Sequence, residues 1–345
     1  MANPDSGCRR VFMVIICIVL GLVLTALIAG TVYANYLLNL MNRPDVENQE
    51  TLTKEQIESL LQEETVAPDA TTAPVMKEED VNWGEQEGSV IEASDNIVNI
   101  LLIGQDARPG EGRSRSDSMI LVTFNKTTKT ITMTSFLRDL YVKIPGYSDN
   151  KMNATYILGG MDLLNETLEQ NFGVQVDGNV EVNFSRFAEI IDLLGGVDME
   201  LRSDEAAYIN TLTGRYVLGS GMQHLDGDQA LQYSRIRALD ADSDFSRTNR
   251  QRKVISALIE KFRNTKLTTL MGLMDDLLPM ITTDLSNTEI LELAKELFPM
   301  LADCTIVSQR IPADGAYHFA TIKQMSCVVA DMDAARELLK QTIGE

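Results

Sequence analysis

The 345-residue chain is poor in cysteine and histidine and lacks the short signatures of several large enzyme classes. Its four cysteines form no Cys-x-x-Cys pair, which argues against a zinc ribbon or a disulfide-dense miniprotein; whether Cys304 and Cys327 pair is left open. The sequence has no Gly-x-Ser-x-Gly elbow, no His-Glu-x-x-His helix and no P-loop. The two histidines, His224 and His318, are more typical of surface or structural positions than of a catalytic pair.

Basic residues are outnumbered as well. Lys and Arg total 30 against 50 Asp and Glu, a formal charge of -20. This charge argues against nucleic acid or an anionic membrane as a partner of the surface as a whole, so we expect no nucleic-acid partner.

One segment near the N-terminus is free of charge altogether. Arg9 and Arg10 precede Val11 to Ala34, 24 uncharged residues that would span roughly 36 Å as a helix. We therefore predict a cytoplasmic N-terminus (1–10), a transmembrane helix (11–36) and the remainder outside, following the positive-inside rule. A cleaved signal peptide ending near Ala34 is the alternative.

The next segment is strongly acidic. Residues 42–95 contain 15 acidic residues against three basic ones, together with three prolines. This composition is typical of a solvated spacer, so we predict an acidic extracellular linker over residues 37–95, with a functional acidic segment as the alternative. Residues 96–345 are long enough for one large domain.

Within residues 96–345 the hydrophobic pattern alternates between strand and helix. An apolar run at residues 96–104 is typical of a buried strand, and the helical periods later in the chain predict covering helices. The pattern indicates an α/β fold with a mixed sheet between helical layers. Further strands are expected at 119–125, 130–136, 141–145, 179–184, 197–201, 305–311 and 324–330, and helices at 161–172, 186–194, 227–235, 247–262, 267–278, 287–298 and from 332.

Arginine and aspartate gather just beyond the ends of the expected strands. Asp106 follows the first strand, Asp117 precedes the second, and Arg138 and Asp139 follow the third. Ligands of open α/β sheets bind outside the carboxyl ends of strands, so Asp106 and Arg138 would share a cleft if their strands are neighbours. Arginine forks bind phosphate oxygens and carboxylates hold Mg²⁺, which indicates a diphosphate with a divalent ion. Structural ion pairs on solvated faces are the alternative.

Eight ordered blocks give the chain a family resemblance. Together they resemble the LytR-CpsA-Psr family, whose members attach glycopolymers to the cell wall of Gram-positive bacteria. The blocks are IGQDAR (103–108) with RSDSM (115–119), SFLRD (135–139), YVKIPG (141–146), KMNATY (151–156), GGVD (195–198), LDGDQAL (225–231), YSRIR (233–237) and DSDFSRTNRQ (242–251). One departure is that Phe136-Leu137 stands where the family usually has a proline before Arg-Asp, which removes a fixed φ ahead of Arg138.

The resemblance implies an α-β-α sandwich and a set of site residues. Asp106 and Asp117 would hold Mg²⁺, with Mn²⁺ as a substitute, and Asp139 is a candidate general base. A hydrophobic groove for a prenyl chain is also implied. The candidate lining residues are Met119, Met152, Met161, Phe184, Ile190 and Leu231, although a place in the plain core is favoured for each of them. The residues that would contact the diphosphate are Arg108, Arg115, Arg138, Arg235, Arg237, Arg247 and Gln251.

The implied activity is transfer of a glycopolymer phosphate from an undecaprenyl-diphosphate carrier to the C6 hydroxyl of N-acetylmuramic acid in peptidoglycan. The enzyme would be a single-pass protein of the cell membrane, with its catalytic domain outside. Two alternatives remain: a polyprenyl-diphosphate sensor, scaffold or transcription attenuator without turnover, and a hydrolase that transfers the phosphate to water. The polymer itself, whether teichoic acid, capsule or another polysaccharide, is left open.

Overall fold

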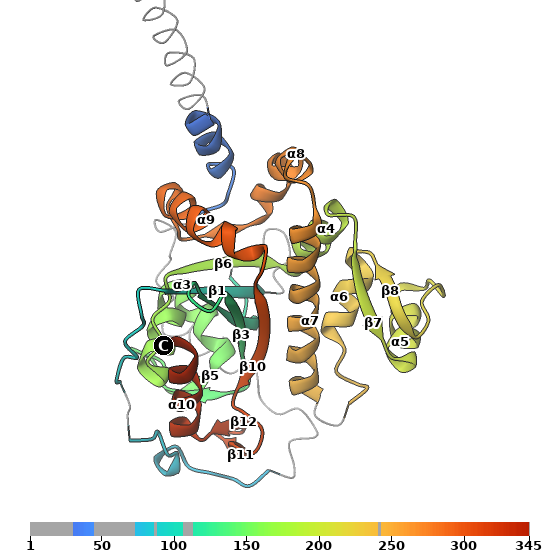
Figure 1. Ribbon diagram of the computed structural model, residues 1–345. Coiled ribbons are helices and arrows are strands. Elements are labelled where there is room, and N and C mark those ends of the chain that lie inside the picture. The colour runs from blue at the N-terminus through green and yellow to red at the C-terminus, as the bar shows by residue number, and fades with distance from the viewer. Residues whose placement is uncertain (1–29, 45–72, 86–87, 106–112, 241–242, 345) are drawn as a thin grey trace, which may run out of the picture.

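The computed structural model describes residues 30–44, 73–85, 88–105, 113–240 and 243–344 (Figure 1). Most of the predicted transmembrane helix (11–36) and two predicted site residues, Asp106 and Arg108, lie outside these ranges. Within the described ranges, no helix combines the length and the hydropathy needed to cross a membrane.

A six-stranded mixed sheet forms the centre of the domain. Its strand order is β10-β3-β2-β1-β6-β9. β1 runs parallel to β6 and β3 parallel to β10, whereas β2 is antiparallel to both β1 and β3. The carboxyl ends of β1, β3, β6 and β10 therefore meet the start of β2 at one edge. The strands are β1 (Ile97–Gln105), β2 (Ser116–Asn125), β3 (Thr130–Phe136), β6 (Gly178–Asn183), β9 (Thr282–Thr283) and β10 (Thr305–Ile311).

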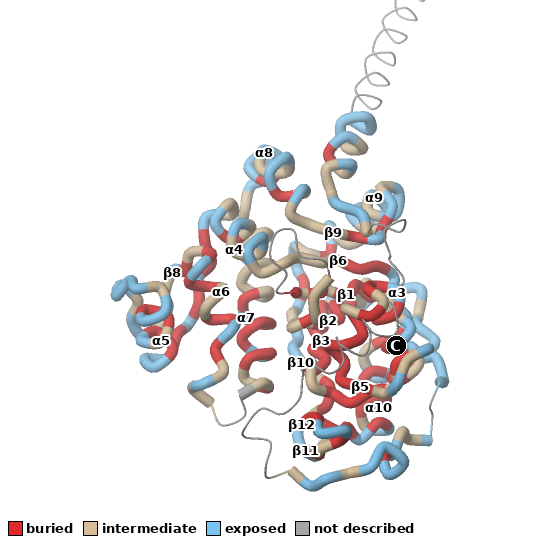
Figure 2. Tube along the Cα trace, turned by 180° about the vertical axis from the view of Figure 1, so that it is seen from behind, coloured by how far each residue is buried: buried red, intermediate tan, exposed pale blue. Residues whose placement is uncertain are grey.

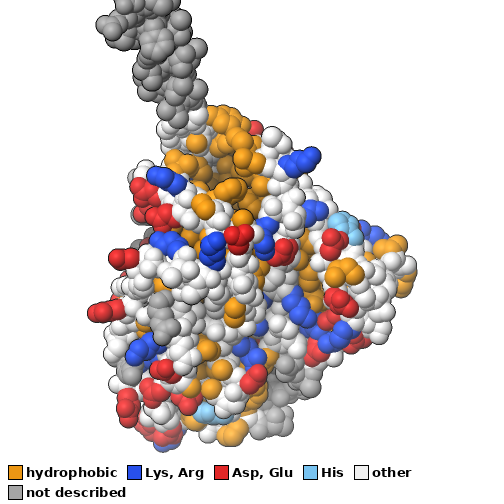
Figure 3. Space-filling model, in the orientation of Figure 1, with side chains coloured by type: hydrophobic (Ala, Val, Ile, Leu, Met, Phe, Trp, Pro, Cys, Tyr) orange, Lys and Arg blue, Asp and Glu red, His pale blue; other side chains and the backbone are white. Residues whose placement is uncertain are grey.

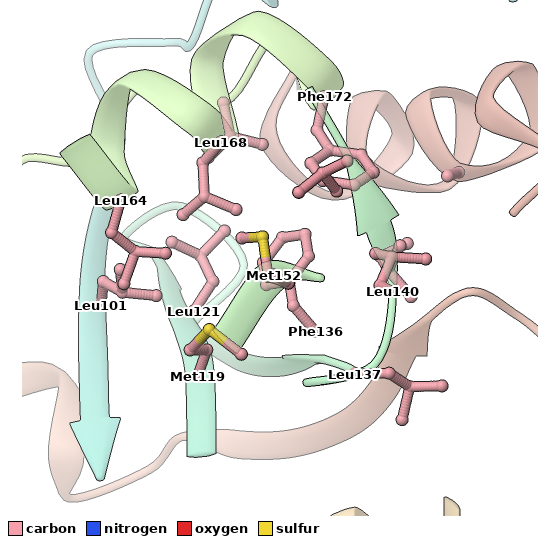
Figure 4. Packing of buried hydrophobic residues seen from close by; sticks show 14 of the residues in the cluster. Leu101, Met119, Leu121, Phe136, Leu137, Leu140, Met152, Leu164, Leu168 and Phe172 are labelled. Atoms are coloured by element: carbon pink, nitrogen blue, oxygen red, sulfur yellow. The ribbon is translucent and has the colours of Figure 1, made fainter. Parts of the chain in front are cut away.

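Helices cover both faces of this sheet. On one face, Leu101 and Leu121 pack against Leu164 and Leu168 of α3 (Met152–Phe172), and α10 (Met332–Ile343) extends the same layer (Figure 4). On the other face, Ile120 and Met133 pack against α7 (Ser243–Asn264) and α9 (Asn287–Leu301). The predicted mixed sheet between helical layers is thus confirmed. Figure 2 shows the strands as mostly buried between the two layers.

A smaller lobe lies beyond α7 and has its own core (Figure 1). Its cluster includes Val197, Leu225, Tyr233 and, from α7, Val254. Because α7 contributes to both this cluster and the packing on the sheet, it fixes the lobe beside the sheet. The lobe comprises α4 (Phe184–Leu193), β7 (Val197–Leu201), α5 (Ser203–Thr213), β8 (Gly221–Leu225) and α6 (Gly227–Arg235).

Short elements close the other end of the domain. The hairpin of β11 (Tyr317–Ile322) and β12 (Met325–Ala330) lies beside β4 (Tyr141–Val142), which pairs with β5 (Asn150–Lys151). Parts of the predicted linker contact this end: Val75 bridges to Thr321, and Val81, which follows a 3-10 turn (Glu78–Asp80), is buried beside Tyr141. Helix α8 (Leu267–Leu277) leads through a 3-10 turn (Leu278–Met280) into β9 at the opposite end.

Several elements differ from the sequence prediction. Helix α3 begins at Met152 instead of residue 161, because a kink at Gly160, with φ 67°, interrupts the helical period. Helix α5 and strand β11 were not predicted, and the fourth strand has two residues. The two described cysteines, Cys304 and Cys327, lie in different hydrophobic clusters and are not bonded to each other.

Candidate functional site

The strand order brings two of the predicted residues into direct contact. Asp117 is the second residue of β2, and Arg138 lies two residues beyond the end of β3. Since β2 is antiparallel to β3, both side chains reach the same edge of the sheet, and Arg138 Nη1 donates to Asp117 Oδ1 at 2.8 Å. Where the family usually has proline, Leu137 donates its N–H to the carbonyl of Ile311, a bond that proline cannot form.

Asp244 is the centre of this charged cluster. It lies in the first turn of α7, with Oδ1 2.7 Å from Arg247 Nη2, 3.7 Å from Arg138 Nε and 4.0 Å from Arg237 Nε. Three arginines predicted to bind diphosphate therefore surround one carboxylate. The sequence prediction had not assigned Asp244 a role, although its spacing three residues before Arg247 on a helix is a signal for such a contact.

Asp139 is held from two sides. Its Oδ2 lies 3.5 Å from Arg138 Nε, and its Oδ1 lies 3.1 Å from Nζ of the largely buried Lys151. Its backbone carbonyl accepts a hydrogen bond from Val328 N at 2.9 Å, so β12 fixes the main chain. Lys151, at the start of α3, is a further site residue that the prediction missed.

The charges in the cluster perturb one another. Burial raises the pKa of Asp244 to about 6, with repulsion from Asp139 adding to the effect and attraction by Arg138 and Arg237 opposing it. Burial disfavours the charged form of Arg138, but Asp139, Asp117 and Asp244 outweigh this and raise the pKa of the guanidinium. Arg138 is therefore a permanent cation shared by three carboxylates.

Several buried polar atoms of the cluster have no hydrogen-bond partner among the described residues. They include Arg138 Nε, Arg247 Nε and Gln251 Oε1. Arg247 is 2% exposed and Gln251 is 8% exposed, so bulk solvent does not fully compensate them. Buried polar groups are almost always bonded, and a missing bond costs about 1–3 kcal/mol. Such groups are typical of a site that a polar ligand completes.

An apolar pocket adjoins the charged cluster along α7. Arg247, Gln251 and Ile255 recur every four residues and so follow one face of the helix. Gln251 and Ile255 line an open pocket of about 600 Å³, with Ile120 and Phe184 among its other walls. The site thus combines a charged end with a hydrocarbon-lined end, which suits an amphiphile with an anionic head.

For three of the six candidate groove residues, the favoured alternative of a place in the core is confirmed. Of the six candidates, only Phe184 lines the pocket. Met119, Met152 and Met161 belong to the core under α3, on the opposite face of the sheet. A strand residue shifted by one position points to the other face, which the sequence alone did not resolve.

Of the remaining predicted residues, the structure describes Arg235 and Arg115. The Arg235 guanidinium lies 5.2 Å from the ring centre of Phe184, at the pocket wall. Arg115 Nη1 donates to Asn153 Oδ1 at 3.4 Å. Asp106 and Arg108 lie in a segment outside the described residues.

A polar group that the prediction missed lies within β6, at Glu181. Glu181 accepts hydrogen bonds from both Gln105 and Tyr156. Gln105, the last residue of β1, also accepts from Ser114 N at 3.1 Å. The parallel pairing of β1 with β6 places these groups together and anchors the chain that leads to Arg115 and Asp117.

A divalent cation is compatible with this arrangement. The carboxylates of Asp117, Asp139 and Asp244 all lie near Arg138. Repulsion from Asp117 and Asp139 contributes to raising the pKa of Asp244, so an added positive charge would be favourable here. Carboxylate oxygens are the ligands that Mg²⁺ prefers. Over the described part of the chain no three acidic, histidine or cysteine side chains form a metal cluster, and Asp106, the predicted companion of Asp117, falls outside it.

A family model and curated relatives of this chain point to the same protein family. The LytR_cpsA_psr family model matches residues 59–342. The polyisoprenyl-teichoic acid–peptidoglycan teichoic acid transferase TagT of Bacillus subtilis (strain 168) is 37% identical over 227 residues, covering 63% of this chain and 69% of TagT. The transferase TagU of Bacillus mycoides is 33% identical over 220 residues, with the same coverage of 63% and 69%.

Solved structures agree with the sequence comparison. The structure described as TagT bound to LI-WTA has a TM-score of 0.61 and 31% identity, covering 77% of this chain and 99% of that one. The LytR-CPS2A-psr family protein YwtF (TagT) with bound octaprenyl pyrophosphate lipid has a TM-score of 0.57 and 28% identity, with the same coverage.

Proposed function

Because this chain belongs to the LytR-CpsA-Psr family, we propose that it is a membrane-anchored phosphotransferase of cell-wall assembly. Its donor would be a glycopolymer carried on undecaprenyl diphosphate, and its acceptor the C6 hydroxyl of N-acetylmuramic acid in peptidoglycan. The names of its relatives, teichoic acid transferases, support this class of reaction. A structural relative with bound octaprenyl pyrophosphate supports the class of donor.

One observation carries the proposal. Buried, unsatisfied polar atoms of Arg138, Arg247 and Gln251 lie where a charged cluster meets an apolar pocket. A prenyl diphosphate has the matching parts, since its oxygens accept hydrogen bonds from guanidinium groups and its hydrocarbon chain fills an apolar pocket. A soluble nucleotide would leave the apolar pocket unfilled.

Asp244 would position the two arginines before the donor arrives. It ion-pairs with Arg138 and Arg247 from one carboxylate, which restricts both long side chains. Donors fixed in advance need little reorganisation as negative charge develops on the departing phosphate. We therefore assign Arg138 and Arg247 to the diphosphate, with Gln251 bonding at the pocket side and Arg235 and Arg237 at the rim.

The reaction is a phosphoryl transfer with balanced bond changes. The acceptor hydroxyl oxygen attacks the phosphorus that carries the sugar, so a new P–O bond forms while the bridging P–O bond of the diphosphate breaks. The lipid monophosphate leaves with that bridging oxygen, and the hydroxyl proton passes to a base. Asp139, oriented by Lys151 and by its backbone bond to Val328, is our candidate base.

Mg²⁺, or Mn²⁺ in its place, would be held by Asp117 together with Asp106 and would neutralise charge on the diphosphate oxygens. The uncharged run Val11 to Ala34 would anchor the chain in the cell membrane with the domain outside, as in Gram-positive bacteria. Tethering would raise the local concentration of enzyme at a donor that is confined to the same membrane.

Product analysis with the full-length protein tests the proposal. The assay combines protein in vesicles, a polyprenyl-diphosphate glycopolymer, uncrosslinked peptidoglycan and Mg²⁺. We expect Arg138→Ala and Asp117→Ala each to lose about 10²–10³-fold in rate, the effect of removing one transition-state contact. Arg186→Ala is the matched control, because Arg186 pairs only with Glu189 on an exposed helix surface among the contacts described.

Each alternative predicts a different result in this assay. Variants as active as the wild type would remove the role of the cluster, and absence of turnover with retained lipid binding would favour a sensor or scaffold. Release of free polymer phosphate without attachment to the glycan would identify a hydrolase.

A further inference from the structure

The N-terminal helix, residues 30–38, is fastened to one end of the domain. Asn287, the first residue of α9, donates from Nδ2 to Asn39 Oδ1 at 2.7 Å and accepts from Arg43 Nη2 at 2.8 Å. The backbone of Asn42 exchanges hydrogen bonds of 2.9 and 3.0 Å with Ile281 and Thr283. The uncharged run that ends at Ala34 therefore reaches the domain at the start of α9, not through a free spacer.

The surface around this attachment carries several exposed apolar side chains. On α9, Leu291 is 38% exposed and Phe298 is 53% exposed; on α8, Leu267 is 59% and Met271 is 44% exposed. Leu267 and Phe298 line the two sides of one groove of about 760 Å³. Figure 3 shows hydrophobic side chains gathered over this end, and Figure 2 shows α8 and α9 largely exposed.

The fastened helix continues the same surface. Val32 is 64% exposed and Tyr36 is 55% exposed. We name the combined surface of Val32, Tyr36, Leu267, Met271, Leu291 and Phe298 the α8–α9 face. Monomeric proteins rarely expose a contiguous apolar surface unless it meets a partner or a membrane.

We propose that the α8–α9 face rests on the outer surface of the lipid bilayer and inserts its apolar side chains among the headgroups. The inference depends on the membrane anchor in the proposed function. A lipid surface is the occupant because the chain enters this same face directly from a 24-residue uncharged run. With the helix fastened to α9, a bilayer that holds this run lies against the face, so docking needs no second partner.

Docking in this orientation explains the course of α7. The helix begins at the charged cluster and ends next to α8, so it connects the site with the α8–α9 face. From Arg247 to Asn264 is 17 residues, about 26 Å at 1.5 Å per residue. Gln251 and Ile255, which line the apolar pocket, lie along this path. The diphosphate would be bound well above the membrane surface. Between the diphosphate and the bilayer, the prenyl chain would lie for part of its length in the apolar pocket.

Depth-dependent fluorescence quenching on the full-length protein tests the docking. The single tryptophan, Trp83, is first replaced by phenylalanine. A new tryptophan then replaces either Met271, on the α8–α9 face, or Met222, an equally apolar control that is 64% exposed on β8 of the small lobe. Each protein is reconstituted in vesicles with or without brominated acyl chains.

We expect brominated lipid to reduce the emission of Met271→Trp by about half or more, as for a side chain roughly 5–10 Å inside the headgroup boundary. Emission of Met222→Trp should change by less than about a tenth. Equal quenching at the two positions in vesicle-bound protein would overturn the docking and leave the anchor intact. If the protein fails to sediment with vesicles, both the anchor and the docking are overturned. Transfer activity is measured in a separate assay, so failure of the docking is distinguished from failure of the proposed function.

A charge substitution gives a second, independent readout. Met271→Glu places a carboxylate on the α8–α9 face, and Met222→Glu places one on the control surface. We expect the α8 amides of vesicle-bound Met271→Glu to exchange hydrogen faster than those of the vesicle-bound wild type, whereas Met222→Glu leaves the exchange of α8 unchanged. Unchanged α8 exchange in vesicle-bound Met271→Glu would contradict the docking.

Discussion

Two arginines three residues apart on α7, Arg250 and Arg247, belong to two ion clusters that differ in how completely their hydrogen bonds are satisfied. Arg250 faces the small lobe, where Nε bonds Glu205 Oε1 at 2.9 Å, Nη1 bonds the carbonyl of Ile236 at 3.2 Å, and Nη2 bonds Asp240. Arg247 faces the sheet edge; it ion-pairs with Asp244, yet its buried Nε has no hydrogen-bond partner among the described residues. Both side chains are 3% exposed.

This difference in hydrogen bonding indicates that the Arg250 cluster stabilises the fold, whereas the Arg247 cluster binds a ligand. Every nitrogen of Arg250 is used inside the protein, so its cluster holds the lobe together and has nothing left for a ligand. The Arg247 cluster keeps unsatisfied donors and a carboxylate, Asp244, whose pKa is raised to about 6, so it is incomplete on its own. Buried polar groups without partners cost free energy, and a ligand, an ion or a water molecule can supply the missing partner.

The largest expected change in the free energy of unfolding follows from a substitution in the Arg250 cluster. Arg250→Ala should lower the free energy of unfolding by about 3–5 kcal/mol, because it leaves the buried Glu205 with only the half-exposed Arg202, whose Nε is 3.9 Å away. Urea denaturation followed by circular dichroism measures the loss. The double variant with Glu205→Ala should lose less than the sum of the two single variants. A change below about 1 kcal/mol in Arg250→Ala would show that the cluster is not structural.

Arg247→Ala should have the opposite profile. We expect transfer activity to fall about 10²–10³-fold, with a change in unfolding free energy of no more than about 1 kcal/mol. Asp244 keeps Arg138 and Arg237, and the substitution also removes buried nitrogens that have no hydrogen-bond partner among the described residues. Arg247→Lys, which keeps the charge but not the fork, should recover only part of the rate. If stability falls as far as in Arg250→Ala, the two clusters do not differ as proposed.

Asp244→Asn should make the protein more stable at neutral pH. The pKa of Asp244 is raised from 3.8 to about 6, so the folded state holds its proton more tightly than the unfolded chain. Stability therefore falls as pH rises from about 4 to 6, and the penalty stays constant above that window. Asparagine removes it, and we expect a gain of about 1–3 kcal/mol near pH 7.5 and none near pH 3.5. Urea melts at both pH values check this; a variant less stable near pH 7.5 would contradict the sign.

The smallest expected change in stability follows from a substitution at the exposed edge of the Arg250 cluster. Arg202 pairs with Asp204 and Asp240, but its side chain is 48% exposed. Arg202→Ala should therefore cost less than about 1 kcal/mol, and raised salt should reduce the difference further. A loss as large as that of Arg250→Ala would mean that burial does not set the ranking. Thermal unfolding at low and high salt measures it.

The sequence singled out Asp117 and Arg138 as site candidates, although the pair that it predicted to share a cleft was Asp106 and Arg138, and Asp106 lies outside the described residues. Asp117 and Arg138 flank strands whose patterns are clear, and antiparallel pairing of β2 with β3 brings them together. The contact of Asp244 with Arg138 depends instead on how α7 is placed between the sheet and the small lobe. No local pattern encodes that tertiary packing, so Asp244 and Lys151 were not assigned.

The elements that the sequence missed share a physical cause. Helix α5 buries Glu205 and Asn210 beside Ala206 and Ile209, so its inward face is half polar and its helical period is weak. The first turns of α3 bury Asn153 and Thr155, and Gly160 then interrupts the helix. Periodicity identifies helices whose inner face is hydrophobic, and it fails where a buried face is polar.

Binding of a prenyl diphosphate to wild-type and variant protein tests the central claim most directly. Isothermal titration with a short-chain prenyl diphosphate in the presence of Mg²⁺ would compare the wild type with Arg247→Ala and the exposed control Arg186→Ala. We predict that Arg247→Ala weakens binding by roughly 10–100-fold, as expected from losing a charge-assisted hydrogen bond worth about 1.5–3 kcal/mol, and that Arg186→Ala leaves it unchanged. Equal affinity of all three proteins would contradict the assignment of the unsatisfied cluster to the diphosphate.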